Sequence, residues 1–277
     1  MSVTLFLLLV FLISLAAGLL GVLTGLGGGV VLIPALMLLL GVNIHYAMGA
    51  SLIAVIVTSS AAAPTFMSQG LSNLRIGLFL ETAAAAGAVG GAILLSVVPS
   101  QFIGILLGIV LLYSAYLSSR QKDDVTSERP SDPIAVRLGM EGEYPTADGV
   151  KEYRVYHVLA GTGLLGVAGV LSGLLGIGSG AVKVLAMDRI MRLPYKISTT
   201  TSNFIIGITA AASAGVYFTR GYIDPGLTMP VVLGVLAGAT FGARVLLRAP
   251  SRILRLVFVI VIAVLGLQLI AKSVGIY

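Results

Sequence analysis

Two glycine-rich runs hold the residues of this chain that are best suited to bind an anion. They contain two triplets of small residues, Gly27, Gly28 and Gly29 in TGLGGG and Gly178, Ser179 and Gly180 in GIGSG. Glycine lets a helix break and lets the backbone approach a ligand, so N–H groups at the positive end of the next helix can face an anion. The triplets therefore predict two facing anion cradles. Close packing of helices through small residues is the alternative explanation.

Side chains with hydroxyl or amide groups follow each glycine run. Such groups can replace part of the hydration shell of an oxyanion without a fixed charge that would trap it. The candidates are Ser51 after the first run and Thr201, Ser202 and Asn203 after the second. Helix capping and interhelical hydrogen bonds explain Ser51, Ser202 and Asn203 equally well. Bonds to the backbone of their own helix are expected for the deeper residues, which are Thr58, Ser59 and Thr209.

Few ionisable residues lie within the apolar segments, and two further candidates stand at segment ends. Lys183 comes a few residues after the second triplet, where an ammonium would attract an anion, although its long stem can also carry the charge to water. Glu81 is a candidate for a coupling proton, but snorkelling toward the cytoplasm or pairing with a nearby arginine explains it better. Gln69 and Arg220 each precede a glycine and are candidate gate residues, although loop termination is the plainer account.

The same pattern occurs twice in the chain. Residues 18–104 resemble the stretch that begins at Gly166, at an offset of 151 positions over most of its length. The matched pairs include Gly27 with Gly178, Gly29 with Gly180, Ser51 with Ser202, Thr58 with Thr209, and Gly70 with Gly221. Two related halves in one apolar chain are typical of transporters, because a site between the halves can be opened to either side by rocking one half on the other.

The composition indicates which solvent surrounds the chain. It has 277 residues, of which 57% are hydrophobic and only 10% charged, and its mean hydropathy is +1.06. One soluble core cannot bury so much apolar surface, so we expect an integral membrane protein. The net charge of +6 does not indicate nucleic-acid binding, because Lys and Arg cluster at segment ends, where anionic headgroups lie. The absence of cysteine excludes thiolate metal sites, and the isolated His45 and His157 predict no metal or cofactor.

Apolar segments divide each half into about five spans. They cover residues 4–23, 29–42, 47–69, 75–98 and 100–118, and then 154–174, 179–193, 198–219, 226–247 and 251–273. The first begins without a basic residue and has a counterpart in mid-chain, so it is expected to remain as a membrane helix. The second and seventh are short, since residues 30–41 would form only about 18 Å of helix against a hydrocarbon core of about 30 Å. These two are predicted to be half-helices or re-entrant.

An odd number of spans per half would place the two halves in opposite orientations, and the basic residues provide a test. Counted over alternating loops, one side receives 14 of the 17 Lys and Arg residues, while Lys183 lies within a segment. The opposite side receives only Arg220 and Lys272. Because positively charged loops stay inside, the central loop is predicted to be cytoplasmic and both termini extracytoplasmic.

Three regions follow from this division. They are a first transmembrane repeat (residues 1–118), a charged cytoplasmic linker (residues 119–153) and a second transmembrane repeat (residues 154–277). The linker holds eight of the 11 acidic residues and so belongs in water. Within it, IAVRLGMEGEY and VKEYRVYHV flank the turn-like TADG, which predicts a small β-hairpin. A solvated tether is the simplest role for this linker.

These motifs resemble the sulfite exporter TauE/SafE family of membrane permeases. The resemblance rests on TGLGGG and SGLLGIGSG, on the segments GASLIAVIVTSS and TTTSNFIIGITAAASA, and on QG or RG before the next helix. It covers nearly everything except the central loop, and its specificity lies in the duplicated arrangement. The resemblance implies a permease for sulfur-containing anions, such as sulfite and organosulfonates, in the bacterial cytoplasmic membrane. The second half departs from the glycine pattern at Ser179, which stands where the first half has Gly28.

We therefore expect an all-α integral membrane protein with an inverted repeat of about five plus five helical segments. A small anion would bind between the halves near the midplane and cross by alternating access, with membrane lipids around the protein and a proton as a candidate coupling ion. The sequence leaves the direction of transport and the oligomeric state open. An anion channel and a non-transporting scaffold are the alternatives. No enzyme is expected, because the serines lack a base close in the sequence.

Overall fold

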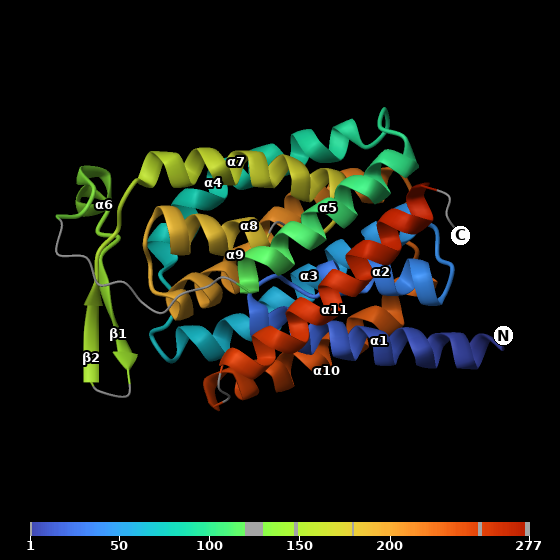
Figure 1. Cartoon of the computed structure of the whole chain (residues 1–277), viewed down its shortest axis with the longest axis horizontal. Helices are drawn as coiled ribbons and strands as arrows, with labels where there is room; N and C mark the ends of the chain where they lie inside the picture. Colours follow the sequence, from blue (N-terminus) through green and yellow to red (C-terminus); the bar gives the residue numbers. More distant parts are fainter. Residues whose placement is uncertain (1, 120–129, 147–148, 179, 249–250, 275–277) are drawn as a thin grey trace.

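The protein is a bundle of long helices with a small β-hairpin at one end (Figure 1). The computed structural model describes residues 2–119, 130–146, 149–178, 180–248 and 251–274. The first half contains α1 (Val3–Thr24), α2 (Gly29–Leu39), α3 (Ile44–Met67), α4 (Leu74–Leu94) and α5 (Ser100–Ser119). The linker contains α6 (Pro133–Arg137), β1 (Gly142–Thr146) and β2 (Gly149–Tyr153). The second half contains α7 (Val158–Leu175), α8 (Gly180–Leu185), the π-helix η1 (Ala186–Ile190), α9 (Tyr195–Thr219), α10 (Pro225–Arg248) and α11 (Ser251–Val274).

The lengths and hydropathy of these helices are those of a multi-pass membrane protein. Within the described residues, six helices have the length and composition of a membrane span, namely α1, α3, α4, α7, α9 and α10. The predicted all-α membrane class is therefore confirmed. The helix α2 has 11 residues, which by helical rise is about 16 Å, or about half of the hydrocarbon core.

Local signals explain where several helices begin and end. The side chains of Ser2, Asn43 and Asn73 accept hydrogen bonds from backbone N–H groups in the first turns of α1, α3 and α4. These contacts satisfy donors that a helix leaves free at its start. The helices α1 and α7 both end at a glycine with positive φ, Gly25 and Gly176 respectively. The first helix of each half therefore stops in the same way.

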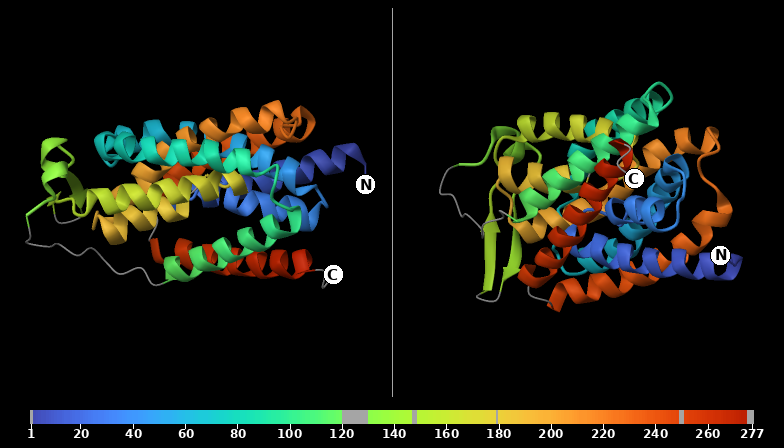
Figure 2. Two further views of the ribbon diagram at one scale, coloured as in Figure 1. Left: turned by 90° about the horizontal axis from the view of Figure 1, so that it is seen from above. Right: turned by 45° about the vertical axis from the view of Figure 1, so that its right-hand side comes forward.

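The long helices of one half pack against long helices of the other half. The helix α1 packs on α10, and α4 packs on α7, so the first helix of each half lies along the fourth helix of the other. The third helices, α3 and α9, form another pair, and the fifth helices, α5 and α11, lie side by side in both views of Figure 2. The segments that follow α1 and α7 are buried inside this arrangement.

Small residues let the paired helices come close together. A methyl group on Gly173 of α7 would lie 1.9 Å from the carbonyl oxygen of Ala88 on α4. A methyl group on Gly238 of α10 would lie 2.0 Å from the carbonyl oxygen of Leu15 on α1. Both contacts are with backbone atoms, which cannot move aside by changing a rotamer. Packing therefore explains these helical glycines.

The described part of the linker forms α6 and an antiparallel hairpin, with Gly142 of β1 opposite Tyr153 of β2. The hairpin lies in the region where the sequence pattern predicts one, but its first strand begins later. Residues 134–137 are helical instead, because Asp132 accepts a hydrogen bond from Ile134 N and caps that turn. Residues 120–129 and 147–148 of the linker lie outside the described residues. Figure 1 places the hairpin at the end of the bundle opposite to the start of α1 and the end of α11.

Hydrogen bonds attach this part of the linker to both halves. Asn73, in the turn before α4, donates from Nδ2 to the Met140 carbonyl at 2.8 Å and to the Tyr153 hydroxyl at 2.7 Å. On the side of the second half, the Asp132 carboxylate accepts from Val158 N at 3.0 Å, and Asp132 N donates to the carbonyl of Val155 at 2.9 Å. The described linker residues are therefore docked on the bundle and do not behave as a free tether.

Candidate functional site

The two glycine runs meet inside the bundle. Gly27 and Gly178 have φ angles of 69° and 77°, which interrupt the helical backbone and which residues with a Cβ rarely adopt. A methyl group on Gly27 would lie 3.2 Å from Val55 and 3.1 Å from Ile206, and one on Gly178 would lie 2.9 Å from both. Val55 on α3 and Ile206 on α9 are fully buried and pack on both interruptions. The two interruptions thus form one unit to which each half contributes equally.

A reciprocal pair of hydrogen bonds holds the interruptions. Ser51 Oγ on α3 donates to the Gly176 carbonyl at 2.8 Å, and Ser202 Oγ on α9 donates to the Gly25 carbonyl at 2.9 Å. The two serines occupy equivalent positions of the repeat, and the two glycines that accept are also equivalent to each other. Neither hydroxyl caps its own helix, so the interhelical explanation applies to both serines. An anion that bound here would compete with a carbonyl for each hydroxyl.

The helices that follow the two interruptions differ in length. The helix α2 begins at Gly29, with Gly28 at its N-cap, and continues for 11 residues. The helix α8 begins at Gly180 and has six residues before the π-helix η1 continues to Ile190. The seventh predicted segment is therefore not one regular helix. Because the helix dipole is a sum over aligned peptide groups, α2 offers an anion the stronger positive end. Ser179 lies outside the described residues.

The remaining triplet residues are close-packed. A methyl group on Gly29 would lie 2.2 Å from Ser51 Oγ, and one on Gly180 would lie 2.5 Å from the Cα of Leu26. A methyl group on Gly28 would lie 2.9 Å from the carbonyl oxygen of Ala17. In this conformation the described triplet residues therefore serve packing, and an anion can reach them only if the two halves move apart.

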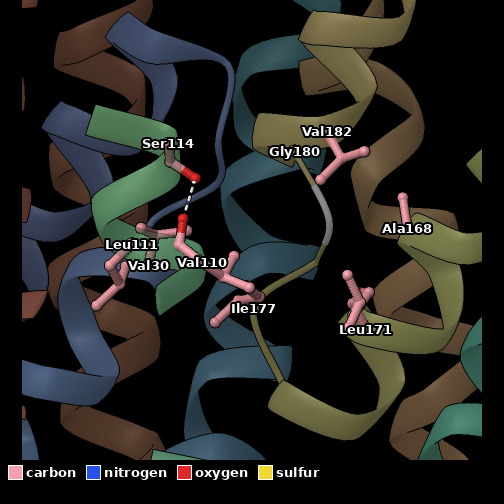
Figure 3. A pocket seen from close by; sticks show the side chains of 10 residues that line it. Val30, Val110, Leu111, Ser114, Ala168, Leu171, Ile177, Gly180 and Val182 are labelled. Atoms are coloured by element: carbon pink, nitrogen blue, oxygen red, sulfur yellow. Dashed lines mark hydrogen bonds between the residues drawn. The ribbon is translucent and has the colours of Figure 1, made fainter. Parts of the chain in front are cut away.

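A small cavity lies beside the second interruption (Figure 3). Its volume is about 10 Å³, which is room for about one water molecule. Val30, Ile177 and Gly180 line it on the side of the interruptions. Ser172 also lines it, and the buried hydroxyl of this residue has no hydrogen-bond partner among the described residues. An anion with three or four oxygen atoms does not fit in this cavity. We refer to this conformation, in which the cavity is too small for such an anion, as the closed conformation.

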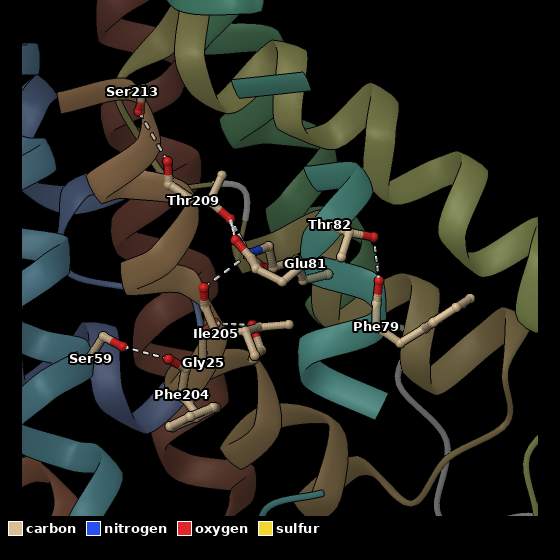
Figure 4. A network of polar contacts seen from close by, with 11 residues as sticks. Gly25, Ser59, Phe79, Glu81, Thr82, Phe204, Ile205, Thr209 and Ser213 are labelled. Atoms are coloured by element: carbon tan, nitrogen blue, oxygen red, sulfur yellow. Dashed lines mark hydrogen bonds and ion pairs between the residues drawn. The ribbon is translucent and has the colours of Figure 1, made fainter. Parts of the chain in front are cut away.

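A buried ion pair lies one helical turn beyond the second interruption. Lys183 on α8 is fully buried, and its Nζ donates to Glu81 Oε2 on α4 at 2.5 Å. Thr209 on α9 completes a closed triangle, because its hydroxyl accepts from Lys183 and donates to Glu81 (Figure 4). The ammonium also lies 3.4 Å from the carbonyl oxygen of Ile205. The charges of the two candidate residues are thus paired with each other inside the bundle.

This triangle corrects two expectations from the sequence, for Glu81 and Thr209, and excludes one alternative for Lys183. Lys183 does not carry its charge to water, and Glu81 neither snorkels nor pairs with an arginine, because the two charges satisfy each other. The hydroxyl of Thr209 bonds to these side chains and not to its own helix. The equivalent Thr58 does bond to its own helix, donating to the Ala54 carbonyl at 2.8 Å.

Ser59 provides a third correction. It was expected to bond to its own helix, but its hydroxyl donates across the interface to the carbonyl of Phe204 on α9 at 2.8 Å. The pairing of Glu81 with Lys183 was also not predicted from the sequence, because the two residues are 102 positions apart and on different helices. The sequence did contain one indication of this pair. One cation and one anion lie deep in apolar segments, and a buried charge needs a partner of opposite charge.

Gly77 brings α4 and α9 close enough for this contact. A methyl group on Gly77 would lie 2.6 Å from Cγ2 of Ile205, so the helices touch at this point. Glu81 and Thr209 follow four residues later on their helices, and residues with this spacing share a helix face. The carboxylate and the hydroxyl therefore meet one turn beyond the closest approach.

The other two candidates on α9 point to different places. Asn203 Nδ2 donates to the carbonyl of Val22 near the end of α1 at 2.9 Å, while its Oδ1 is buried without a partner among the described residues. Asn203 thus belongs, with Ser202, to the surroundings of the first interruption. Thr201 Oγ1 accepts from Asn73 N at 3.0 Å, so it serves the turn before α4.

The two candidate gate residues differ in their surroundings. Gln69 is exposed just beyond the end of α3. Arg220 donates to the carbonyls of Ala92 and Ile93 in the last turn of α4, at 3.3 and 3.1 Å. These carbonyls lie at the negative end of the helix dipole, and the Ile93 carbonyl also accepts from Ser96 Oγ at 3.1 Å. Capping of α4 therefore accounts for Arg220.

The structure describes a multi-pass helical bundle with paired helix interruptions and a buried ion pair, and the comparisons with known proteins place this bundle among membrane transporters. The chain belongs to the sulfite exporter TauE/SafE family, whose model matches residues 10–269. It is 27% identical over 270 residues to the probable membrane transporter protein YunE of Bacillus subtilis, covering 95% of this chain and 96% of the relative. No solved structure matches the chain significantly.

Two further relatives carry the same description. The probable membrane transporter protein YdhB of Bacillus subtilis is 29% identical over 268 residues, which cover 96% of this chain and 99% of the relative. The probable membrane transporter protein ORF9 of Sinorhizobium sp is 24% identical over 261 residues, which cover 94% of this chain and 91% of the relative. The resemblance that the motifs indicated is thus confirmed, and the family is one of transporters and not a class of enzymes.

Proposed function

We propose that the protein is a permease for small sulfur-containing anions, such as sulfite and organosulfonates, and that it works by alternating access. The observation that carries the proposal is the contact between the interruptions, where Gly27 and Gly178 pack on the same two side chains. Because both halves contribute alike, a movement of either half changes the surroundings of the same central unit. The family description supports an anion of this class.

The anion would bind between the interruptions. The N-terminus of α2 supplies a partial positive charge, and Lys183 supplies a full one. Ser51, Ser202 and Asn203 supply hydroxyl and amide groups that can take the place of water around an oxyanion. In the closed conformation these side chains are engaged with protein partners. Binding therefore requires that the halves separate and release them.

The two halves are proposed to cross the membrane in opposite orientations. The exchange of first with fourth helices, together with the pairing of third with third, is the pattern that a two-fold axis between the halves requires. Figure 1 supports this orientation, since α1 runs toward the hairpin end of the bundle and α7 runs away from it. With most basic residues counted on the side of the linker, that end would face the cytoplasm.

Anion exchange in proteoliposomes tests the transport proposal. Vesicles that hold the purified protein would be loaded with unlabelled sulfite, thiosulfate or an alkylsulfonate and then given the radiolabelled form outside. We expect saturable exchange of at least one of these anions, in competition with the others, and none in vesicles without protein. Folded, monodisperse protein that exchanges none of them would contradict the permease and favour a scaffold. Flux above about 10⁶ ions per second would instead indicate a channel.

Single cysteines test the orientation, because the chain has no native cysteine to interfere. Val3→Cys in α1 and Glu143→Cys in β1 change exposed residues at opposite ends of the bundle. A membrane-impermeant maleimide applied to intact cells should label Val3→Cys, whereas labelling of Glu143→Cys should require permeabilised cells. Labelling of both residues from outside would contradict the proposed orientation.

A further inference from the structure

The ionic triangle of Glu81, Lys183 and Thr209 has no ionic counterpart in the repeat. The equivalent positions hold, in the same order, Val232, Leu32 and Thr58. A buried ion pair costs each ion its hydration, and apolar residues of similar size are often at least as stable. The three equivalent residues carry no charge, so this arrangement of helices does not require an ion pair at this position. Function explains this pair better than folding does.

In the closed conformation Lys183 is not available to an incoming anion. Its ammonium is held by Glu81 Oε2, by the Thr209 hydroxyl and by the Ile205 carbonyl. An anion that arrived here would place two negative charges beside one positive charge, out of contact with water. Burying such an uncompensated charge costs several kcal/mol or more. The anion must therefore displace the carboxylate, and the carboxylate must lose its charge.

We propose that Lys183 exchanges Glu81 for the transported anion and that Glu81 takes up a proton in the same step. This inference rests on the proposed function, because it requires an anion to reach Lys183. Before the exchange, the ammonium is paired with a carboxylate. After it, the ammonium is paired with the anion, and Glu81 is a neutral carboxylic acid. One monoanion and one proton enter together, the total charge of the site is unchanged, and transport is electroneutral cotransport with one proton.

The position of the pair suits this exchange. Ile205, whose carbonyl faces the ammonium, is the neighbour of Ile206, which packs on both interruptions. Lys183 is on α8, directly after the second interruption, whereas Glu81 is on α4 of the other half. A movement of one half on the other therefore separates these two charges. It does so beside the place where the anion would bind.

Few other titratable groups lie on the elements packed around Glu81, and the contacts described next lie away from its carboxylate. Arg75 of α4 donates to the Gly139 carbonyl, and Tyr217 of α9 donates to the Gly173 carbonyl. Asp188 and Arg189 of η1 face each other at 3.5 Å, and Lys196 is exposed near the start of α9. The helix α7 has no titratable side chain. Lys183 is thus the ionisable group that contacts the Glu81 carboxylate in the described part of the chain.

Accumulation driven by a pH gradient tests the coupling. The substrate would be a radiolabelled alkylsulfonate, which remains a monoanion between about pH 6 and pH 8 and does not cross lipid as a neutral acid. The membrane potential would be clamped at zero with potassium and valinomycin. With the outside one pH unit more acidic, one-to-one cotransport gives about tenfold accumulation in wild-type vesicles, since each tenfold gradient is worth about 1.4 kcal/mol. Glu81→Gln cannot take up the proton, so it should reach about equal concentrations on both sides.

Exchange of labelled for unlabelled anion separates the two proposals. Exchange by the wild type needs no net proton uptake, because Glu81 keeps its proton while one anion replaces another. Wild-type exchange without accumulation would overturn the coupling and leave the permease in place, and accumulation by Glu81→Gln would also overturn it. Loss of exchange for all sulfur anions in folded wild-type protein would overturn the permease and the coupling together.

A second measurement keeps the inference testable if Glu81→Gln fails to fold. Adding the alkylsulfonate to wild-type protein in weakly buffered detergent should remove about one proton per bound anion from solution, as read by a pH indicator. Binding without proton uptake would overturn the coupling. Thr209→Val should move the pH profile of binding upward, because the carboxylate loses a donor. Thr58→Val, the matched change in the other half, should leave the profile unchanged, since Thr58 bonds only to its own helix.

Discussion

The two helix interruptions are alike in backbone and different in charge. Gly27 and Gly178 share a left-handed conformation and the same packing partners, and both are held by a serine from the opposite half. The segment after the first interruption is a regular helix with the apolar Leu32. The segment after the second is short, becomes a π-helix and carries Lys183.

The difference separates two requirements of a transporter. A movement that opens to either side needs two similar halves, and the shared packing of the interruptions meets that need. Recognition of an anion needs positive charge, but one buried cation is enough, and a second would have to be neutralised at further cost. In the proposed mechanism, duplication would provide the moving parts, and the divergence at Lys183 and Glu81 would provide the charge.

Removing the cation should have the largest effect. Lys183→Met leaves the Glu81 carboxylate buried without its partner, which costs about 3–5 kcal/mol, and it removes the proposed attraction for the anion. We expect anion exchange in proteoliposomes to fall to the level of empty vesicles. The matched control is Leu32→Met at the equivalent position, a change of similar volume that should cost less than about 1.5 kcal/mol and preserve exchange.

A double variant separates folding from anion binding in this test. Lys183→Met combined with Glu81→Gln has no unpaired charge, so its apparent melting temperature by circular dichroism should recover most of the loss. Anion exchange should remain absent, because the positive charge is still missing. Exchange at the wild-type rate by either variant would show that Lys183 is not the group that binds the anion.

Adding a methyl group to the interruptions should have the next largest effect. Gly27→Ala and Gly178→Ala combine a positive φ, which costs about 1–2 kcal/mol, with a clash against Val55 and Ile206. Both should reduce exchange strongly and lower the melting temperature. Gly70→Ala and Gly221→Ala carry similar φ angles of 65° and 71° but meet nothing within 4 Å.

These two surface glycines isolate the contribution of packing. They are equivalent to each other in the repeat, as Gly27 and Gly178 are, so all four substitutions introduce similar backbone strain. If the surface variants lose as much exchange as the central ones, then strain alone explains the loss. The contact between the interruptions would in that case have no special role in transport.

The reciprocal serines should have equal and smaller effects. Ser51→Ala and Ser202→Ala each leave a buried glycine carbonyl without its donor, at a cost of about 1–3 kcal/mol. Because the two bonds are equivalent, the two melting temperatures should fall by similar amounts. A large difference in stability would show that the halves share the contact unequally, while different effects on anion affinity would identify which serine faces the anion.

The sequence predicts the apolar helices and the breaks at the glycine runs well because each is a local pattern. Apolar length marks a membrane helix, and an offset of 151 marks the duplication without any structure. Long-range contacts have no such signature in a single chain. The bond from Ser59 to Phe204 depends on how α3 packs on α9. The pairing of Glu81 with Lys183 depends on how α4, α8 and α9 pack, and Gly77 lets α4 approach Ile205 of α9.

The smallest expected effect concerns the linker, which the repeat does not contain. Tyr153→Phe removes an acceptor for Asn73, whose Nδ2 still donates to the Met140 carbonyl, so docking should weaken by about 1 kcal/mol. The weaker docking should appear as faster hydrogen exchange at the amides of residues 149–155. Anion transport should be unchanged. Reduced transport would show that the docked hairpin takes part in the movement of the halves.

The same hydroxyl gives the linker a dependence on alkaline pH. Burial raises the pKa of Tyr153 above its usual value of 10.0, although the hydrogen bond from Asn73 opposes this shift. The folded state thus holds the phenolic proton more tightly than the unfolded state, so docking loses stability as pH rises above about 10. Tyr153→Phe has no proton to lose. The measurement is again hydrogen exchange at residues 149–155, corrected for intrinsic exchange rates. If these amides exchange equally fast in the wild type and in this variant above pH 10, then Tyr153 is not buried against the bundle as described.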